Sequence, residues 1–210
     1  MNRLFISIAL MLVGSCLLPG QLKKRMSDDK GHEAIAHFLG KNQGAQGGQI
    51  IAIDDDPVGQ VLPFDRFYVL HFRRYPVAPA LPESLTYNNL LVVHADEQVE
   101  LIRDSSALEG LFRSQVRSVT SELQARNTVK AWLRLTQEFH QDGFFQFSTP
   151  DASLLVLPQR KGIRASGKAE VTPDYGNSGW IAISLSFDDD GKLTDIKETP
   201  NVIAGRRPNF

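Results

Sequence analysis

Cysteine is nearly absent from the chain, because Cys16 is the only one among 210 residues. The sequence after Cys16 therefore cannot form a disulfide or supply a metal site built on thiolates. A catalytic cysteine is excluded from the same region. Any fold formed there must be held by packing and hydrogen bonds, for which an apolar share of 42% is ordinary in globular proteins.

A surplus of charge of either sign is also missing. The chain carries 23 Lys and Arg against 24 Asp and Glu, which gives a formal net charge of -1. Proteins that bind nucleic acid usually carry a marked basic surplus. The composition therefore predicts no nucleic-acid partner.

The amino-terminal apolar run is too short for a permanent membrane span. It extends from residue 4 to residue 18 and is preceded by Arg3. At a rise of 1.5 Å per residue a helix of this length reaches about 22 Å, whereas the bilayer core is about 30 Å thick. A positive charge, a short apolar stretch and then small residues form the pattern of a signal peptide.

Four residues near the end of this run resemble a known processing motif. Val13-Gly14-Ser15-Cys16 resembles the lipobox of bacterial lipoproteins, with an aliphatic residue and two small ones before the cysteine. The resemblance implies cleavage before Cys16, a diacylglyceryl thioether on its sulfur and usually an acyl chain on the new amino group. Two or three chains anchor a protein stably where one does not. The implied location is the cell envelope, at the outer membrane in a Gram-negative cell because Leu17, not aspartate, follows the cysteine.

Two other interpretations of the amino terminus stay open. One is an exported chain that is cleaved elsewhere or keeps its signal segment, although no A-x-A site lies nearby. The other is a cytosolic protein that starts at Met26. The cations Lys23, Lys24 and Arg25 favour the second alternative, since positive charge soon after the apolar run opposes export.

We predict one α+β domain at residues 32–210, preceded by a signal peptide at 1–15 and a flexible tether at 16–31. In the domain an antiparallel sheet packs against two main helices. Ser106 and Glu109 match a capping box. The helix after it has an apolar stripe at spacings of three and four, formed by Leu108, Leu111, Phe112, Val116, Val119 and Leu123.

Three further helical features complete the helix prediction. A short helix is expected at residues 32–39. Asn127 or Thr128 is expected to cap the second main helix. That helix should end at Asp142-Gly143.

Alternating apolar residues predict the strands. The best hairpin runs from Trp180 to Phe187 and from Lys192 to Glu198, with a turn at Asp188–Gly191 in which Gly191 takes a positive φ. One face of its first strand should be buried. The other expected strands are residues 49–53, 66–74, 89–93, 98–102, 144–147, 154–157 and 168–172.

No metal or cofactor motif is complete. His32 and His37 lie five residues apart, whereas a helical zinc motif needs a spacing of four. The runs at 54–56 and 188–190 place acids consecutively, whereas a calcium loop spaces them at alternate positions. A surface turn explains the second run equally well. We therefore predict neither a metal nor a cofactor.

Catalytic motifs are incomplete as well. Residues 176–180 depart from a nucleophile elbow because Trp180 replaces the last glycine and a strand follows. His71 and His94 lie near Asp65 and Asp96 in the sequence, so a spatially assembled His and carboxylate site remains an alternative.

Basic residues gather toward the carboxyl terminus. They suggest an anion-binding patch for envelope glycans or lipid headgroups, with a solvated loop as the simpler interpretation. These residues are Arg160, Lys161, Arg164, Lys168, Arg206 and Arg207.

The leading hypothesis is thus an envelope lipoprotein with a non-catalytic binding or assembly role. It would be anchored to a membrane through Cys16, with an envelope protein or glycan as partner. The competing hypotheses are an envelope hydrolase and a cytosolic globular protein.

Overall fold

The computed structural model describes residues 26–41, 48–72, 90–140, 145–173 and 178–201. Its helices are α1 (Asp28–Lys41), α2 (Asp56–Val61), α4 (Ser105–Gln115) and α5 (Glu122–His140), and a 3-10 turn spans Asp151–Ser153. Its strands are β1 (Gly48–Ala52), β2 (Arg66–Phe72), β3 (Leu90–Val93), β4 (Val99–Leu101), β5 (Phe145–Ser148), β6 (Leu155–Pro158), β7 (Ile163–Pro173), β8 (Gly179–Phe187) and β9 (Leu193–Asn201). The predicted α+β class is confirmed. The expected signal peptide and Cys16 lie outside the described residues.

All described strand pairs are antiparallel, but the strands divide into two sheets. The first has the order β1-β2-β3-β4. The second has the order β5-β7-β8-β9, with β6 also paired to β7. The sequence prediction did not separate the two sheets, because the alternation of apolar residues shows that a strand has a buried face but not which sheet it joins.

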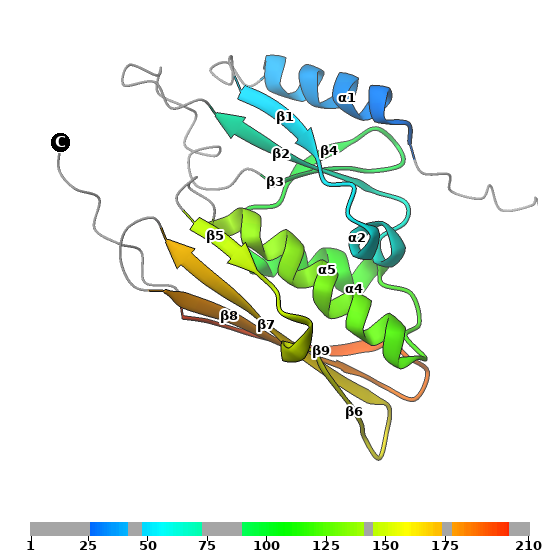
Figure 1. The fold of residues 1–210 in the computed structure, drawn as a ribbon. Helices are drawn as coiled ribbons and strands as arrows, with labels where there is room; N and C mark the ends of the chain where they lie inside the picture. The colour runs from blue at the N-terminus through cyan, green and yellow to red at the C-terminus, as the bar shows by residue number, and fades with distance from the viewer. Residues whose placement is uncertain (1–25, 42–47, 73–89, 141–144, 174–177, 202–210) are drawn as a thin grey trace, which may run out of the picture.

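Figure 1 shows four layers: α1, the first sheet, the helices α2, α4 and α5, and the second sheet. The larger core lies where the helical layer packs between the two sheets. Trp132 on α5 and Phe112 on α4 meet there edge to face, with ring centroids 4.9 Å apart. Aromatic rings prefer this geometry. One face of the second sheet is therefore covered, and none of the described helices lies on its other face, which we call the bare face.

A smaller core lies between α1 and the first sheet and contains Ile35, Tyr68 and Leu91. The helix can approach closely because Gly31 has no side chain: a Cβ there would lie 1.9 Å from the Tyr68 hydroxyl oxygen. That hydroxyl donates to Asp28 Oδ1 at 3.0 Å. Helix α1 begins at Asp28, so the prediction that residues 28–31 are flexible tether is wrong.

The starts of both main helices differ from the prediction. Asp104, not Ser106, caps α4, and its carboxylate accepts from Ala107 N at 2.8 Å. A capping box of Ser121 and Gln124 precedes α5: Ser121 Oγ accepts from Gln124 N at 3.2 Å, and Gln124 Oε1 accepts from Ser121 N at 3.1 Å. Several polar residues match the capping pattern, and the backbone path selects one of them.

Those boundaries change the roles of five residues. Asn127 and Thr128 lie inside α5, not at its start. Leu123 is 67% exposed and does not belong to the apolar stripe. Val116 and Val119 lie in the link between the helices, where Val119 is buried.

The predicted hairpin is confirmed. Gly191 has a φ of 75° in the turn between β8 and β9, and the predicted core face of β8 is buried. Helix α2 was missed. It begins at the last of the acids at residues 54–56, where Pro57 fixes a φ that suits the first turn of a helix.

Candidate functional site

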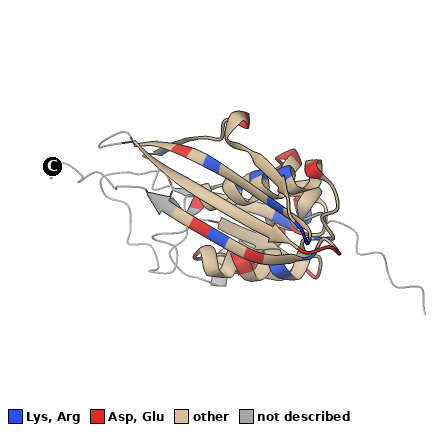
Figure 2. Ribbon diagram, turned by 90° about the horizontal axis from the view of Figure 1, so that it is seen from below, with Lys and Arg blue, Asp and Glu red and all other residues tan. Residues whose placement is uncertain are grey.

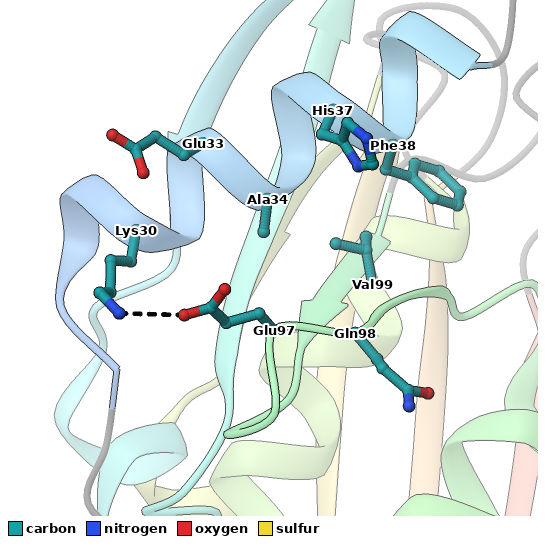
Figure 3. A pocket seen from close by; sticks show the side chains of 8 residues that line it. All are labelled: Lys30, Glu33, Ala34, His37, Phe38, Glu97, Gln98 and Val99. Atoms are coloured by element: carbon teal, nitrogen blue, oxygen red, sulfur yellow. Dashed lines mark hydrogen bonds and ion pairs between the residues drawn. The ribbon is translucent and has the colours of Figure 1, made fainter.

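An open groove lies between α1 and the hairpin of β3 and β4 (Figure 3). Its volume is about 550 Å³. The helix presents alternating polar and apolar side chains to it, and the turn of the hairpin closes the other side. The lining residues are Lys30, Glu33, Ala34, His37, Phe38, Glu97, Gln98 and Val99.

An ion pair bridges the groove. Lys30 Nζ lies 3.0 Å from Glu97 Oε1, and Figure 3 shows these two side chains pointing toward each other. The hydrogen bond and the charge of Glu97 raise the pKa of the Lys30 ammonium. Glu97 adopts a φ of 67°, a left-handed backbone conformation that is uncommon outside glycine. That turn aims its carboxylate at the helix.

The groove is mixed in character. Ala34, Phe38 and Val99 pack against the smaller core and leave part of their apolar surface in the groove. Glu33 and His37 add polar groups from the helix. An apolar strip with polar groups along it suits an amphipathic segment or a small ligand. Sequence reasoning missed this groove, because Glu97 and Lys30 are 67 residues apart in the chain.

The two histidines of α1 do not come together. His32 Nε2 lies 3.5 Å from Asp28, and its ring meets Tyr68 edge to face at 5.2 Å. His37 lines the groove instead. Within the described ranges, no cluster of three His, Cys, Asp or Glu residues is arranged to hold a metal ion.

A second polar cluster joins β2, β3, β4 and α4. Asp65 is 3% exposed and accepts hydrogen bonds from His94 Nδ1 at 3.1 Å and from Gln115 Nε2 at 2.5 Å. The other ring nitrogen of His94 lies 3.3 Å from Glu100 Oε2. The hydrogen bond from His94 to Asp65 raises the pKa of the imidazole, against the opposing effect of burial.

This cluster brings together one histidine and one carboxylate that the sequence analysis named. Asp65 pairs with His94, and the side chain of His71 lies outside the described part. Asp96 accepts from Gln98 N at 3.2 Å within the turn. Because both ring nitrogens of His94 face carboxylates, neither is left to take a proton from a substrate. The cluster therefore acts as a clamp between the first sheet and α4.

The two acidic runs have local roles. Asp54 lies 3.5 Å from Arg66, and Asp55 pairs with Arg134. Asp188 Oδ1 accepts from Asp190 N at 3.1 Å and from Lys192 N at 2.8 Å. These contacts stabilise the turn that the sequence predicted there.

The bare face of the second sheet brings part of the predicted basic patch together. Arg164 and Lys168 project from it on β7, and Lys197 projects from β9. Arg160 and Lys161 lie at the β6–β7 turn, whereas Arg206 and Arg207 lie outside the described residues. Lys197 was missed, because only the strand register places it opposite Ser184 on β8, one strand beyond β7.

Comparison with known proteins finds no match for this chain, whether among family models, curated proteins or solved structures. Among the described helices, none combines the length and the apolar character that crossing a bilayer requires.

Proposed function

We propose that the protein is a lipoprotein of the bacterial cell envelope whose folded body binds a partner and performs no catalysis. The main support for this proposal is the pattern Val13-Gly14-Ser15-Cys16 near the end of a short apolar run. Cys16 is the sole cysteine of the chain. Acyl chains on Cys16 would hold the molecule at a membrane. The α+β body would then work beside that membrane, at the outer membrane in a Gram-negative cell.

The groove under α1 supports the binding role. It is open, its rim carries charges of both signs, and its floor is apolar. Such a surface recognises a segment of an envelope protein more readily than it activates a bond, since no base and nucleophile converge among its lining residues. The proposed partner is therefore an envelope protein segment with an apolar face and a polar edge.

Metabolic labelling with an alkyne-bearing fatty acid tests the anchor. The wild type should take up the label and sediment with membranes, and Cys16→Ser should take up none. A label on the thiol can only be at Cys16, because no other cysteine exists. The control is Ser15→Ala, which keeps a small residue before the cysteine and should stay labelled. An unlabelled wild type would refute the anchor.

One observation favours a second candidate, an envelope hydrolase. His94 Nδ1 lies 3.1 Å from the buried carboxylate of Asp65, the arrangement that orients a catalytic imidazole. This candidate requires Glu100 to move from Nε2 to free that nitrogen. It predicts that His94→Asn abolishes hydrolysis of a chromogenic ester by the purified protein, whereas the binding role predicts no hydrolysis by the wild type.

The third candidate, a cytosolic protein starting at Met26, is tested by the same labelling. It predicts an unlabelled soluble chain whose first residue is Met26. In that case the groove under α1 would serve a cytosolic partner.

A further inference from the structure

The bare face of the second sheet has a shallow trough along β8. Figure 2 shows this face from below, with the uncharged β8 between charged residues on β7 and β9. The outward residues of β8 include Ala182, Ser184 and Ser186, all small. Longer side chains on the neighbouring strands rise on both sides of them.

The strand register shows which outward residues of neighbouring strands lie side by side, in rows that cross the trough. One row crosses the sheet as Lys197, Ser184, Ser166 and Leu155. The next rows are Asp195, Ser186, Arg164 and Leu157 on one side, and Thr199, Ala182 and Lys168 on the other. Along β7 a hydroxyl lies between two cations, and along β9 a cation lies between an acid and a hydroxyl; Leu155 and Leu157 form an apolar rim.

A cavity of about 310 Å³ lies in this trough. Among the described residues, the charged side chains that line it are those of Lys168 and Lys197. Hydroxyls complete the polar lining, and no carboxylate of the described part lines the cavity. The full lining is Ser153, Ser166, Gly167, Lys168, Ala182, Ile183, Ser184, Lys197 and Thr199.

None of the ion pairs among the described residues joins Lys168 or Lys197 to a carboxylate within 4.0 Å. Lys168 Nζ lies over the ring of Trp180, 5.2 Å from its centroid. Arg164 Nε donates to Ser184 Oγ at 3.1 Å, so the hydroxyl hydrogen of Ser184 points elsewhere. Glu170 and Asp195 project from the same face, but neither lines the cavity.

We propose that this cavity binds a carboxylated carbohydrate, with Lys168 and Lys197 flanking the carboxylate and the hydroxyls of Ser166, Ser184 and Thr199 bonded to the sugar. The proposal rests on the envelope location of the proposed function, which would place acidic glycans within reach. It assigns the second sheet a ligand separate from the protein segment under α1.

The chemistry of the cavity selects this ligand. Strand amides pair within the sheet, and the Lys168 amide donates to Ser153 Oγ at 3.3 Å, so the cavity offers side-chain donors alone. Lysines also bind phosphate, but phosphate sites typically add backbone amides at a helix end or Arg forks, and neither of these lines the cavity. Two separated ammonium groups suit a single negative charge per sugar. Hydroxyl side chains on a small-residue floor suit the hydroxyls of a flat ring.

The experiment measures the affinity of the purified full-length protein, in a non-ionic detergent, for a galacturonic acid oligomer by calorimetry. Lys168→Gln with Lys197→Gln should weaken binding about tenfold or more. The matched control is Arg103→Gln with Lys192→Gln, which removes the same charge outside the cavity and should change affinity less than about twofold. Circular dichroism checks that both variants are folded.

Two further probes decide the ligand class. A neutral galactose oligomer should bind at least about tenfold more weakly, since it lacks the carboxylates. Vesicles of anionic phospholipid should not compete with the acidic oligomer. Equal loss in both double variants, or competition by vesicles, would overturn the proposal. These measurements do not depend on acylation of Cys16. A protein that does not bind the acidic oligomer would therefore overturn this proposal without contradicting the lipid anchor, which the labelling experiment tests.

Discussion

The indole Nε1 of Trp132 donates a hydrogen bond to Oε2 of Glu198, and the two atoms lie 2.6 Å apart. The same carboxylate accepts from Ser105 Oγ at 2.8 Å and from Thr136 Oγ1 at 3.3 Å. One side chain of β9 therefore ties α4 and α5 to the second sheet. Trp132 is 1% exposed, so its N–H has no access to bulk water if the carboxylate is removed.

Removal of that carboxylate should destabilise the fold. We expect Glu198→Ala to lower the free energy of unfolding by about 1–3 kcal/mol, because it leaves a buried donor without a partner. Glu198→Gln keeps an acceptor and should cost less. Urea unfolding followed by the fluorescence of Trp132, in a Trp180→Phe background, measures both.

The matched control is Asp195→Ala, three residues earlier on the same strand but on the exposed face. It should change the free energy of unfolding by less than about 0.5 kcal/mol. If Glu198→Ala costs no more than this control, the carboxylate does not stabilise the packing of the helices on the sheet.

Gly167 marks a close approach of α5 to the second sheet. A Cβ at this position would lie 2.6 Å from Val129 Cγ1 and 2.7 Å from Leu154 Cδ2. Gly167→Ala should therefore lower the free energy of unfolding by about 1–3 kcal/mol through overpacking. Gly110→Ala is the contrasting variant, since nothing lies within 4 Å of its Cβ position inside α4. That helical substitution should stabilise by up to about 1 kcal/mol.

Chemical denaturation of both glycine variants separates steric crowding from backbone effects. If the two substitutions change the free energy of unfolding in the same direction and by the same amount, Gly167 is not needed for the close contact between α5 and β7.

His94 should make stability depend on pH. Its pKa is raised above the ordinary value of 6.5 by the hydrogen bond to Asp65. A raised pKa in the folded state adds stability below the unfolded pKa, and this gain disappears as the pH rises through the folded pKa. The stability lost in His94→Asn should therefore be larger near pH 5.5 than near pH 9.

Asp65→Asn supplies the control for the histidine. In that background the effect of His94→Asn should vary less with pH, because the main cause of the raised pKa is gone. An equal loss at both pH values in the wild-type background would contradict the clamp between Asp65 and His94.

Local patterns predicted the elements better than their arrangement. The alternation at residues 180–187 identified β8 and its buried face, and Gly191 identified the turn. Capping patterns were ambiguous because Asp104, Ser106 and Ser121 all match them, and only the backbone conformation selects the cap. The division into two sheets depends on contacts between distant strands, which no local pattern encodes.

The candidate sites likewise depend on contacts that local sequence patterns do not show. The basic residues of β7 were visible in the sequence, but Lys197 joins them only through the register of β8 and β9. His94 and Asp65 are 29 residues apart, and proximity along the chain does not select one carboxylate as the partner of His94. Spatial pairs of this kind require the tertiary fold.

The mass of the native protein tests the central claim most directly. Intact mass spectrometry of the protein purified from its own membranes should give a chain that begins at Cys16 and carries a diacylglyceryl group, with an acyl chain on the amino group where that step occurs. A chain that begins at Met1 or Met26 with no lipid mass would contradict the account.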